Sequence, residues 1–129
     1  MFLEIDTASD VPIYQQIYDG VVVGIASGEL KDGDQLPTSR QLAEDIGINM
    51  HTVNKSYALL KQDGFISLQR RNGAIITQRG SPASSDISAI TTLISSAAAQ
   101  AKGRNVRKEE FLKLCDEIYS NLNKGGALK

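Results

Sequence analysis

Amide, hydroxyl and cationic side chains gather in two short stretches of this 129-residue chain, and their chemistry is that of hydrogen bonding. Cationic groups pair with phosphates, while amides and hydroxyls bond to phosphate oxygens or to the edges of bases. The two stretches therefore predict contacts with nucleic acid. The candidates of this kind are Asn49, His51, Thr52, Asn54, Lys55, Arg70 and Arg71.

Most of these candidates also have a simpler interpretation. Asn49 can cap a helix first and contact a ligand second, and Thr52 can bind a phosphate or act as a cap. Asn54 and Lys55 suit a base edge and a phosphate, but solvated residues would look the same in sequence. We interpret His51, the only histidine, as an exposed side chain that faces a groove.

Bond-breaking chemistry is not expected. The chain has one histidine and one cysteine in different segments, so they cannot be combined into a nucleophile and its base. It has no phosphate-binding glycine motif and no cluster with metal-ligand spacing. We therefore predict no enzyme, no cofactor and no metal. The single cysteine and the lack of an N-terminal apolar run predict a cytoplasmic protein.

Charge is unevenly distributed along the chain, although the net charge is only −1. Residues 1–37 carry one basic and seven acidic side chains. Residues 38–80 carry six basic and three acidic ones, and residues 81–129 carry seven and five. The basic excess thus coincides with the candidates, as a local phosphate footprint requires.

The first group of candidates falls within a predicted helix-turn-helix. Thr38 and Gln41 have the spacing of a capping box, which begins a short helix. Gly47 supplies the left-handed conformation that ends it, and Asn49 caps a second helix. In this motif the first residues of the second helix meet the bases in the major groove. The apolar stripe of that helix is Val53, Tyr57 and Leu60.

A further helix is predicted before this motif, beginning near Pro12 with Asp10 as its cap and ending at Gly28. Residues 31–34 read as a turn, and the apolar start of the chain, residues 1–5, could pair as an edge strand. The stripe of the helix is Ile13, Ile17, Val21 and Ile25.

A hairpin is predicted after the motif. Phe65–Gln69 and Ala74–Gln78 are β-prone runs, and the Asn-Gly pair between them is the strongest short hairpin signal. Arg70 and Arg71 would lie at its tip, which has no structural need for two arginines. Helix, helix-turn-helix and hairpin together form a winged helix.

The C-terminal part is predicted as two helices with apolar seams at 3-4 spacing. A polar linker, residues 79–85, precedes them, and Gly103 is expected to end the first helix. Because so small a hairpin cannot bury both seams, we predict a four-helix interface with a second copy. The seam residues are Ile87, Ile90, Ile94, Ala97, Ala101, Phe111, Cys115, Ile118 and Leu122.

The predicted fold is thus mainly α with a small β-hairpin. Residues 1–80 form a winged helix-turn-helix domain, and residues 81–129 form a two-helix dimerisation hairpin.

From Pro12 to Gln78 the chain resembles the GntR family of bacterial transcription regulators. The short tail and the stretch 48–57 are similar to its YtrA-like subfamily. The resemblance rests on several motifs taken together. They include Pro12-Ile-Tyr-Gln-Gln-Ile17, Gly33-Asp-Gln-Leu-Pro37, Ser39-Arg-Gln-Leu-Ala43 and Gly64-Phe-Ile66.

The resemblance implies a homodimeric, sequence-specific repressor that binds a palindromic operator in double-stranded DNA, often that of a transporter operon. It adds four DNA-binding candidates. Arg40 could instead pair with Glu44 one helical turn away. The sequence identifies no small-molecule effector. The added candidates are Thr38, Ser39, Arg40 and Gly73.

Two positions depart from the family pattern. Met50 stands where members often carry an arginine used on DNA, and Arg71 stands where the wing usually has a glycine. A different class of function stays open beside the regulator. In that alternative the winged helix binds protein and not DNA, and the tail docks a partner helix.

Overall fold

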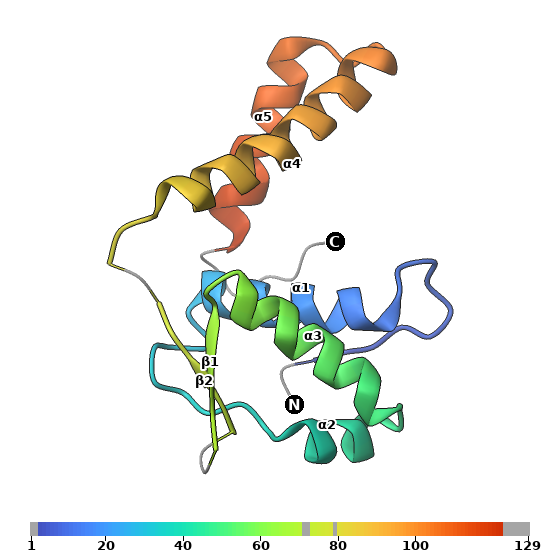
Figure 1. Ribbon diagram of the computed structural model, residues 1–129. Coiled ribbons are helices and arrows are strands. Elements are labelled where there is room, and N and C mark those ends of the chain that lie inside the picture. The colour runs from blue at the N-terminus through green and yellow to red at the C-terminus, as the bar shows by residue number, and fades with distance from the viewer. Residues whose placement is uncertain (1–2, 71–72, 79, 123–129) are drawn as a thin grey trace. The chain divides into compact units, whose positions relative to one another are not determined.

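The computed structural model describes residues 3–70, 73–78 and 80–122, and these divide into two compact units (Figure 1). Unit 1 spans Met1–Gln78 and unit 2 spans Arg79–Lys129. Unit 1 is three helices with a two-stranded antiparallel sheet, and unit 2 is a pair of helices. The elements are α1 (Ile13–Ser27), α2 (Ser39–Ile46), α3 (Met50–Gln62), β1 (Ile66–Gln69), β2 (Gly73–Ile76), α4 (Ser84–Gly103) and α5 (Lys108–Leu122).

The core of unit 1 is built from apolar stripes on all of its elements. On α1 the predicted stripe is confirmed, since Ile17, Val21 and Ile25 are buried. The predicted stripe of α3 is buried as well, and it packs against α1, α2 and the sheet. The largest fully buried side chains are Ile17, Val21, Leu36, Leu42, Val53, Ser56, Leu60 and Ile76.

The helix-turn-helix forms as the local signals predict. Gln41 N–H donates to Thr38 Oγ1 over 3.1 Å, and Thr38 N–H donates to Gln41 Oε1 over 3.0 Å, which completes the capping box. Gly47 ends α2 with a φ of 79°. Asn49 Oδ1 accepts from the backbone N–H of His51 over 2.8 Å and so caps α3.

The N-terminal segment differs from expectation. Residues 3–5 form no strand, and Leu3 is instead buried against α1. Gly20 makes room for it, because a Cβ there would stand 2.1 Å from Leu3 Cδ2. The cap of α1 is Pro12 and not Asp10. The sequence pattern correctly indicated an apolar segment at the start of the chain. That segment buries Leu3 by packing against α1 and not by pairing as a strand.

The wing is the antiparallel pair of β1 and β2, with Gln69 opposite Gly73. A third segment, which sequence analysis did not predict, lies along the other side of β2. Gln35 forms an isolated bridge with Ile75, and Leu36 N–H donates to the carbonyl of Ala74 over 2.8 Å. The wing is therefore tied at its base to the segment that leads into α2.

Unit 2 consists of α4, α5 and the turn between them. Gly103 is the last residue of α4 and not its stop signal; the left-handed conformation falls on Asn105, with a φ of 63°. Val106 N–H then donates to the carbonyl of Ala101 over 2.9 Å, as in a Schellman turn. Within the described residues, no helix combines the length and the apolar character needed to cross a bilayer.

Candidate nucleic-acid interface

The inner face of α3 is fixed to unit 1 by two hydrogen bonds as well as by its apolar stripe. Ser56 Oγ, which is fully buried, donates to the carbonyl of Tyr14 in α1 over 2.7 Å. The Tyr57 hydroxyl donates to the carbonyl of Pro37 over 2.7 Å. The first bond joins α3 to α1, and the second joins it to the residue that precedes the cap of α2. The orientation of α3 is therefore set by the body of unit 1.

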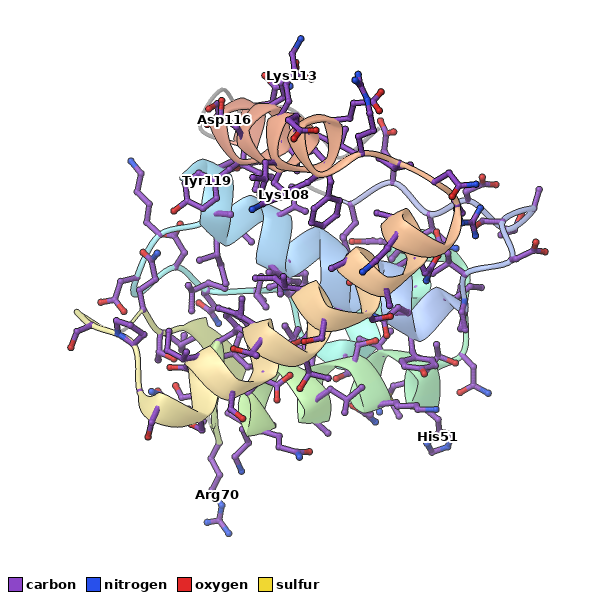
Figure 2. All side chains as sticks on the ribbon, turned by 90° about the horizontal axis from the view of Figure 1, so that it is seen from above. His51, Arg70, Lys108, Lys113, Asp116 and Tyr119 are labelled. Carbon is purple, nitrogen blue, oxygen red and sulfur yellow. The ribbon has the colours of Figure 1, made fainter. Side chains whose placement is uncertain are left out.

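The outer face of α3 presents polar side chains to solvent. Asn49, His51, Asn54 and Lys55 are exposed, and Thr52 is half-buried. His51 points away from the ribbon (Figure 2), in agreement with the exposed position predicted for it. Asn49 uses its side-chain oxygen for the cap, so its amide nitrogen is the group that can donate to a ligand.

Lys55 has a partner within unit 1 that its sequence position did not reveal. Its Nζ atom lies 3.9 Å from the centroid of the Tyr14 ring, a cation–π contact. Tyr14 thus meets α3 twice, through its carbonyl with Ser56 and through its ring with Lys55. The residue is still exposed, so its ammonium group can meet a phosphate from this position.

The start of α2 carries three further candidates. Thr38 and Arg40 are exposed, and Ser39 is half-buried. Arg40 and Glu44 are both exposed, and the structure shows no ion pair between them; the DNA contact of Arg40 stays a prediction. Arg40 lines a shallow, open groove between α2 and the beginning of α3. The other residues of the groove are Ala43, Glu44, Gly47, Ile48 and Met50.

At the wing, the Arg70 side chain is exposed and projects away from the body of unit 1 (Figure 2). Gly73 begins β2 with a φ of 66°, a conformation that favours glycine. A Cβ at Gly73 would lie 3.8 Å from Thr38 Cγ2, so the tip end of β2, where Gly73 pairs with Gln69, adjoins the cap of α2. Arg71 lies outside the described residues.

The pKa values of two tyrosine hydroxyls are raised, and both hydroxyls donate hydrogen bonds within unit 1. Burial raises the pKa of Tyr57. Burial also raises the pKa of Tyr18, and its hydrogen bond to Asp63 raises it further. The Tyr18 ring meets Phe65 edge to face, with centroids 6.1 Å apart. Both tyrosines are structural donors: Tyr18 donates to Asp63 at the C-terminal cap of α3, and Tyr57 donates to Pro37 ahead of α2.

Three comparisons with known proteins agree on a family. Residues 13–76 match the model described as "Bacterial regulatory proteins, gntR family". The HTH-type transcriptional repressor YtrA of Bacillus subtilis (strain 168) is 38% identical over 76 residues, which cover 59% of this chain and 58% of the repressor. A solved structure of YtrA from Sulfolobus acidocaldarius, a GntR-family transcription factor, is 38% identical with a TM-score of 0.63. That match covers 77% of this chain and 99% of the solved one.

The chain belongs to the GntR family. A second solved structure, a transcriptional antiterminator from Listeria monocytogenes EGD-e, has a TM-score of 0.87 at 25% identity. It covers all of this chain and 98% of its own. The winged helix-turn-helix predicted from the sequence is thereby confirmed. The chain spans little more than half of the curated YtrA repressor, and smaller shares of several other curated relatives that it matches.

The seam residues of this GntR protein divide between two environments. Ala101, Phe111 and Leu122 are half-buried. The others are exposed, and Leu93, Leu112, Leu114 and Tyr119, which the 3-4 spacing did not include, are exposed beside them. Strict 3-4 spacing misses such residues because it selects a narrower stripe than these helices carry. The exposed seam residues are Ile87, Ile90, Ile94, Ala97, Cys115 and Ile118.

Metal-binding chemistry finds no support in this part of the chain. Among the residues that the structure describes, no group of three or more His, Cys, Asp or Glu side chains is placed to hold a metal ion. The outer face of α3 in unit 1 carries exposed hydrogen-bond donors and a cation, an arrangement that suits binding.

Proposed function

We propose that this chain is a sequence-specific DNA-binding transcription regulator that represses a nearby operon as a homodimer. The observation that carries the proposal is the double fixation of α3, whose inner face bonds to Tyr14 and Pro37 while its outer face is polar and exposed. A helix of this kind presents its side chains to the major groove without reorganisation. The repressor activity named for a relative from Bacillus subtilis supports the direction of regulation.

Each part of the interface has a proposed role. Side chains at the start of α3 read base edges, while Arg40 and Lys55 meet phosphates. The wing enters the minor groove beside them. Arg70 and Arg71 supply its cations, and Gly73 lets the backbone approach. Thr38, Ser39 and Thr52 add phosphate contacts. The proposed readers of bases are Asn49, His51 and Asn54.

The C-terminal helices are the proposed dimer interface. A two-fold dimer reads a palindromic operator whose half-site centres lie about one helical turn of DNA apart, or a multiple of it. Residues 1–80 then act as the DNA-binding domain and residues 81–129 as the dimerisation tail. The proposed regulator works in the cytoplasm and has no catalytic role.

The test is the salt dependence of DNA binding by the full chain, on a duplex selected from a random pool. Each neutralised phosphate contributes about 0.9 to the slope of log affinity against log salt. Arg40→Ala and Lys55→Ala should each weaken binding and lower the slope by about one such contribution. Lys61→Ala is the matched control, because Lys61 is exposed in the last turn of α3, away from its base-reading end.

A wild-type slope near zero would contradict the proposal and favour a protein-binding winged helix. Charge reversal at Arg70 and Arg71 should also abolish DNA binding under the proposed function. Lys55 allows a finer distinction, since its contact with the Tyr14 ring gives it a structural role. If that role were its only one, Lys55→Ala would lower stability and leave the salt slope unchanged.

A further inference from the structure

Met50 is an apolar side chain placed among polar ones at the reading end of α3. It is the first residue of the helix and is 36% exposed. Its neighbours Asn49 and His51 are polar and exposed. Among the described residues of the helix-turn-helix it is the one exposed large apolar side chain. The core of unit 1 therefore does not account for it.

The surroundings of Met50 are partly apolar and open. It lines the groove between α2 and α3 together with Ile48, Ala43 and the Arg40 side chain. Ile48 is half-buried and Ala43 is buried, so the floor of the groove is apolar while Arg40 stands exposed at its edge. An occupant of this groove would meet an apolar surface, the Arg40 cation and the exposed carboxylate of Glu44.

The chemistry of methionine limits what Met50 can recognise on DNA. Its thioether has no hydrogen to donate and is a weak acceptor, so it cannot pair with the polar atoms of a base edge. The major groove offers one apolar feature, the C5-methyl group of thymine. A flexible, polarizable side chain adapts well to such a contact.

We infer that Met50 is a specificity-determining residue that recognises a thymine methyl group in each half-site. This inference rests on the proposed function and deepens it, because it names the base that one position of α3 selects. Arg40 at the edge of the groove then binds the neighbouring phosphate.

The experiment removes the methyl group from the DNA and leaves every hydrogen-bonding atom in place. A duplex selected from a random pool is prepared with each thymine of one half-site replaced in turn by uracil. The full chain should bind one of these duplexes about fourfold more weakly, the effect expected from one buried methyl group. Met50→Ala should bind the thymine and uracil forms of that duplex equally.

Two control variants separate recognition from general weakening. Met50→Leu keeps an apolar side chain and should restore discrimination between thymine and uracil at the same position. Leu68→Ala removes another exposed apolar side chain of unit 1, on the wing, and should leave that discrimination unchanged.

Equal binding of every uracil duplex by the wild-type chain would overturn the inference and leave the proposed function intact. Full discrimination by Met50→Ala would do the same, as would a selected half-site without thymine. A chain that selects no sequence and shows no salt dependence would overturn the proposed function and this inference together.

Discussion

Units 1 and 2 carry the same kind of apolar stripe and use it in opposite ways. On α1, Ile17 and Val21 are fully buried. On α4, Ile90 and Ile94 follow the same helical spacing but are 50% and 55% exposed. The described residues of unit 1 include thirteen buried hydrophobic ones, whereas neither α4 nor α5 has a buried residue of any kind.

The difference lies in what surrounds each helix. α1 packs against α3 and is covered in part by Leu3, so its stripe meets other apolar side chains of the same chain. The two helices of unit 2 make only a narrow contact with one another, and Ala101, Phe111 and Leu122 are half-buried. Among the described residues of unit 2, 80–122, the rest of that apolar surface is exposed. One copy of the chain therefore completes the core of unit 1, and unit 2 is expected to complete its core on a second copy.

The strongest test of this comparison puts a charge on the exposed stripe. Ile94→Asp or Ile118→Asp should convert a dimer into monomers, because an uncompensated charge in a buried interface costs about 3–5 kcal/mol. The dimer dissociation constant should rise at least about a hundredfold, as measured by analytical ultracentrifugation at micromolar concentration. Urea unfolding of unit 1 should stay cooperative.

Thr92→Asp is the matched control on α4, since Thr92 is exposed but lies outside the apolar stripe. It should remain dimeric. A wild-type chain that is monomeric at this concentration, and binds operator DNA as a single copy, would break the comparison.

A large effect is also expected in the core of unit 1. Leu60 of α3 is fully buried, so Leu60→Ala should lower the free energy of unfolding by about 2–5 kcal/mol. Leu68→Ala makes the same chemical change at a wing position that is 46% exposed. That control should change stability by less than about 1 kcal/mol. If Leu60→Ala and Leu68→Ala lowered the free energy of unfolding equally in urea titrations, unit 1 would not form a complete core within one chain.

The smallest effect concerns the hydrogen bond between Tyr57 and Pro37. Tyr57→Phe should lower stability at neutral pH by about 1 kcal/mol, since the Pro37 carbonyl loses its donor. Burial raises the pKa of Tyr57, so its hydroxyl stays protonated in the fold above the pH at which the unfolded chain ionises. The stability it contributes is therefore present below about pH 10 and is lost as the pH rises further.

Thermal unfolding between pH 7 and pH 11 measures both effects. Tyr57→Phe should lose less stability than the wild type as the pH rises from 7 to 11. Tyr18, whose pKa is also raised, should account for part of the loss of stability that remains. Tyr119→Phe is the control, because that side chain is 75% exposed on α5. A pH profile unchanged by Tyr57→Phe would argue against a buried hydroxyl at this position.

The sequence by itself determined the features that depend on neighbouring residues. The capping box of Thr38, the turn at Gly47 and the cap at Asn49 were all predictable, because backbone geometry places their partners within four residues. The helical stripes and the hairpin follow from the same short-range periodicity. These signals were enough to predict the winged helix-turn-helix and to locate most of its candidate site.

Only the tertiary structure decided which distant residues meet. The Tyr14 carbonyl accepts from Ser56, 42 residues away, and its ring holds Lys55. Gln35 pairs with Ile75, and Gly73 adjoins Thr38, although no local sequence signal predicts either contact. The small size of the two-helix hairpin predicted that its seams would not be fully buried, but which of their residues are half-buried and which are exposed was decided by packing. Spacing along a helix fixes which side chains share a face, but only packing of the whole unit determines what that face touches.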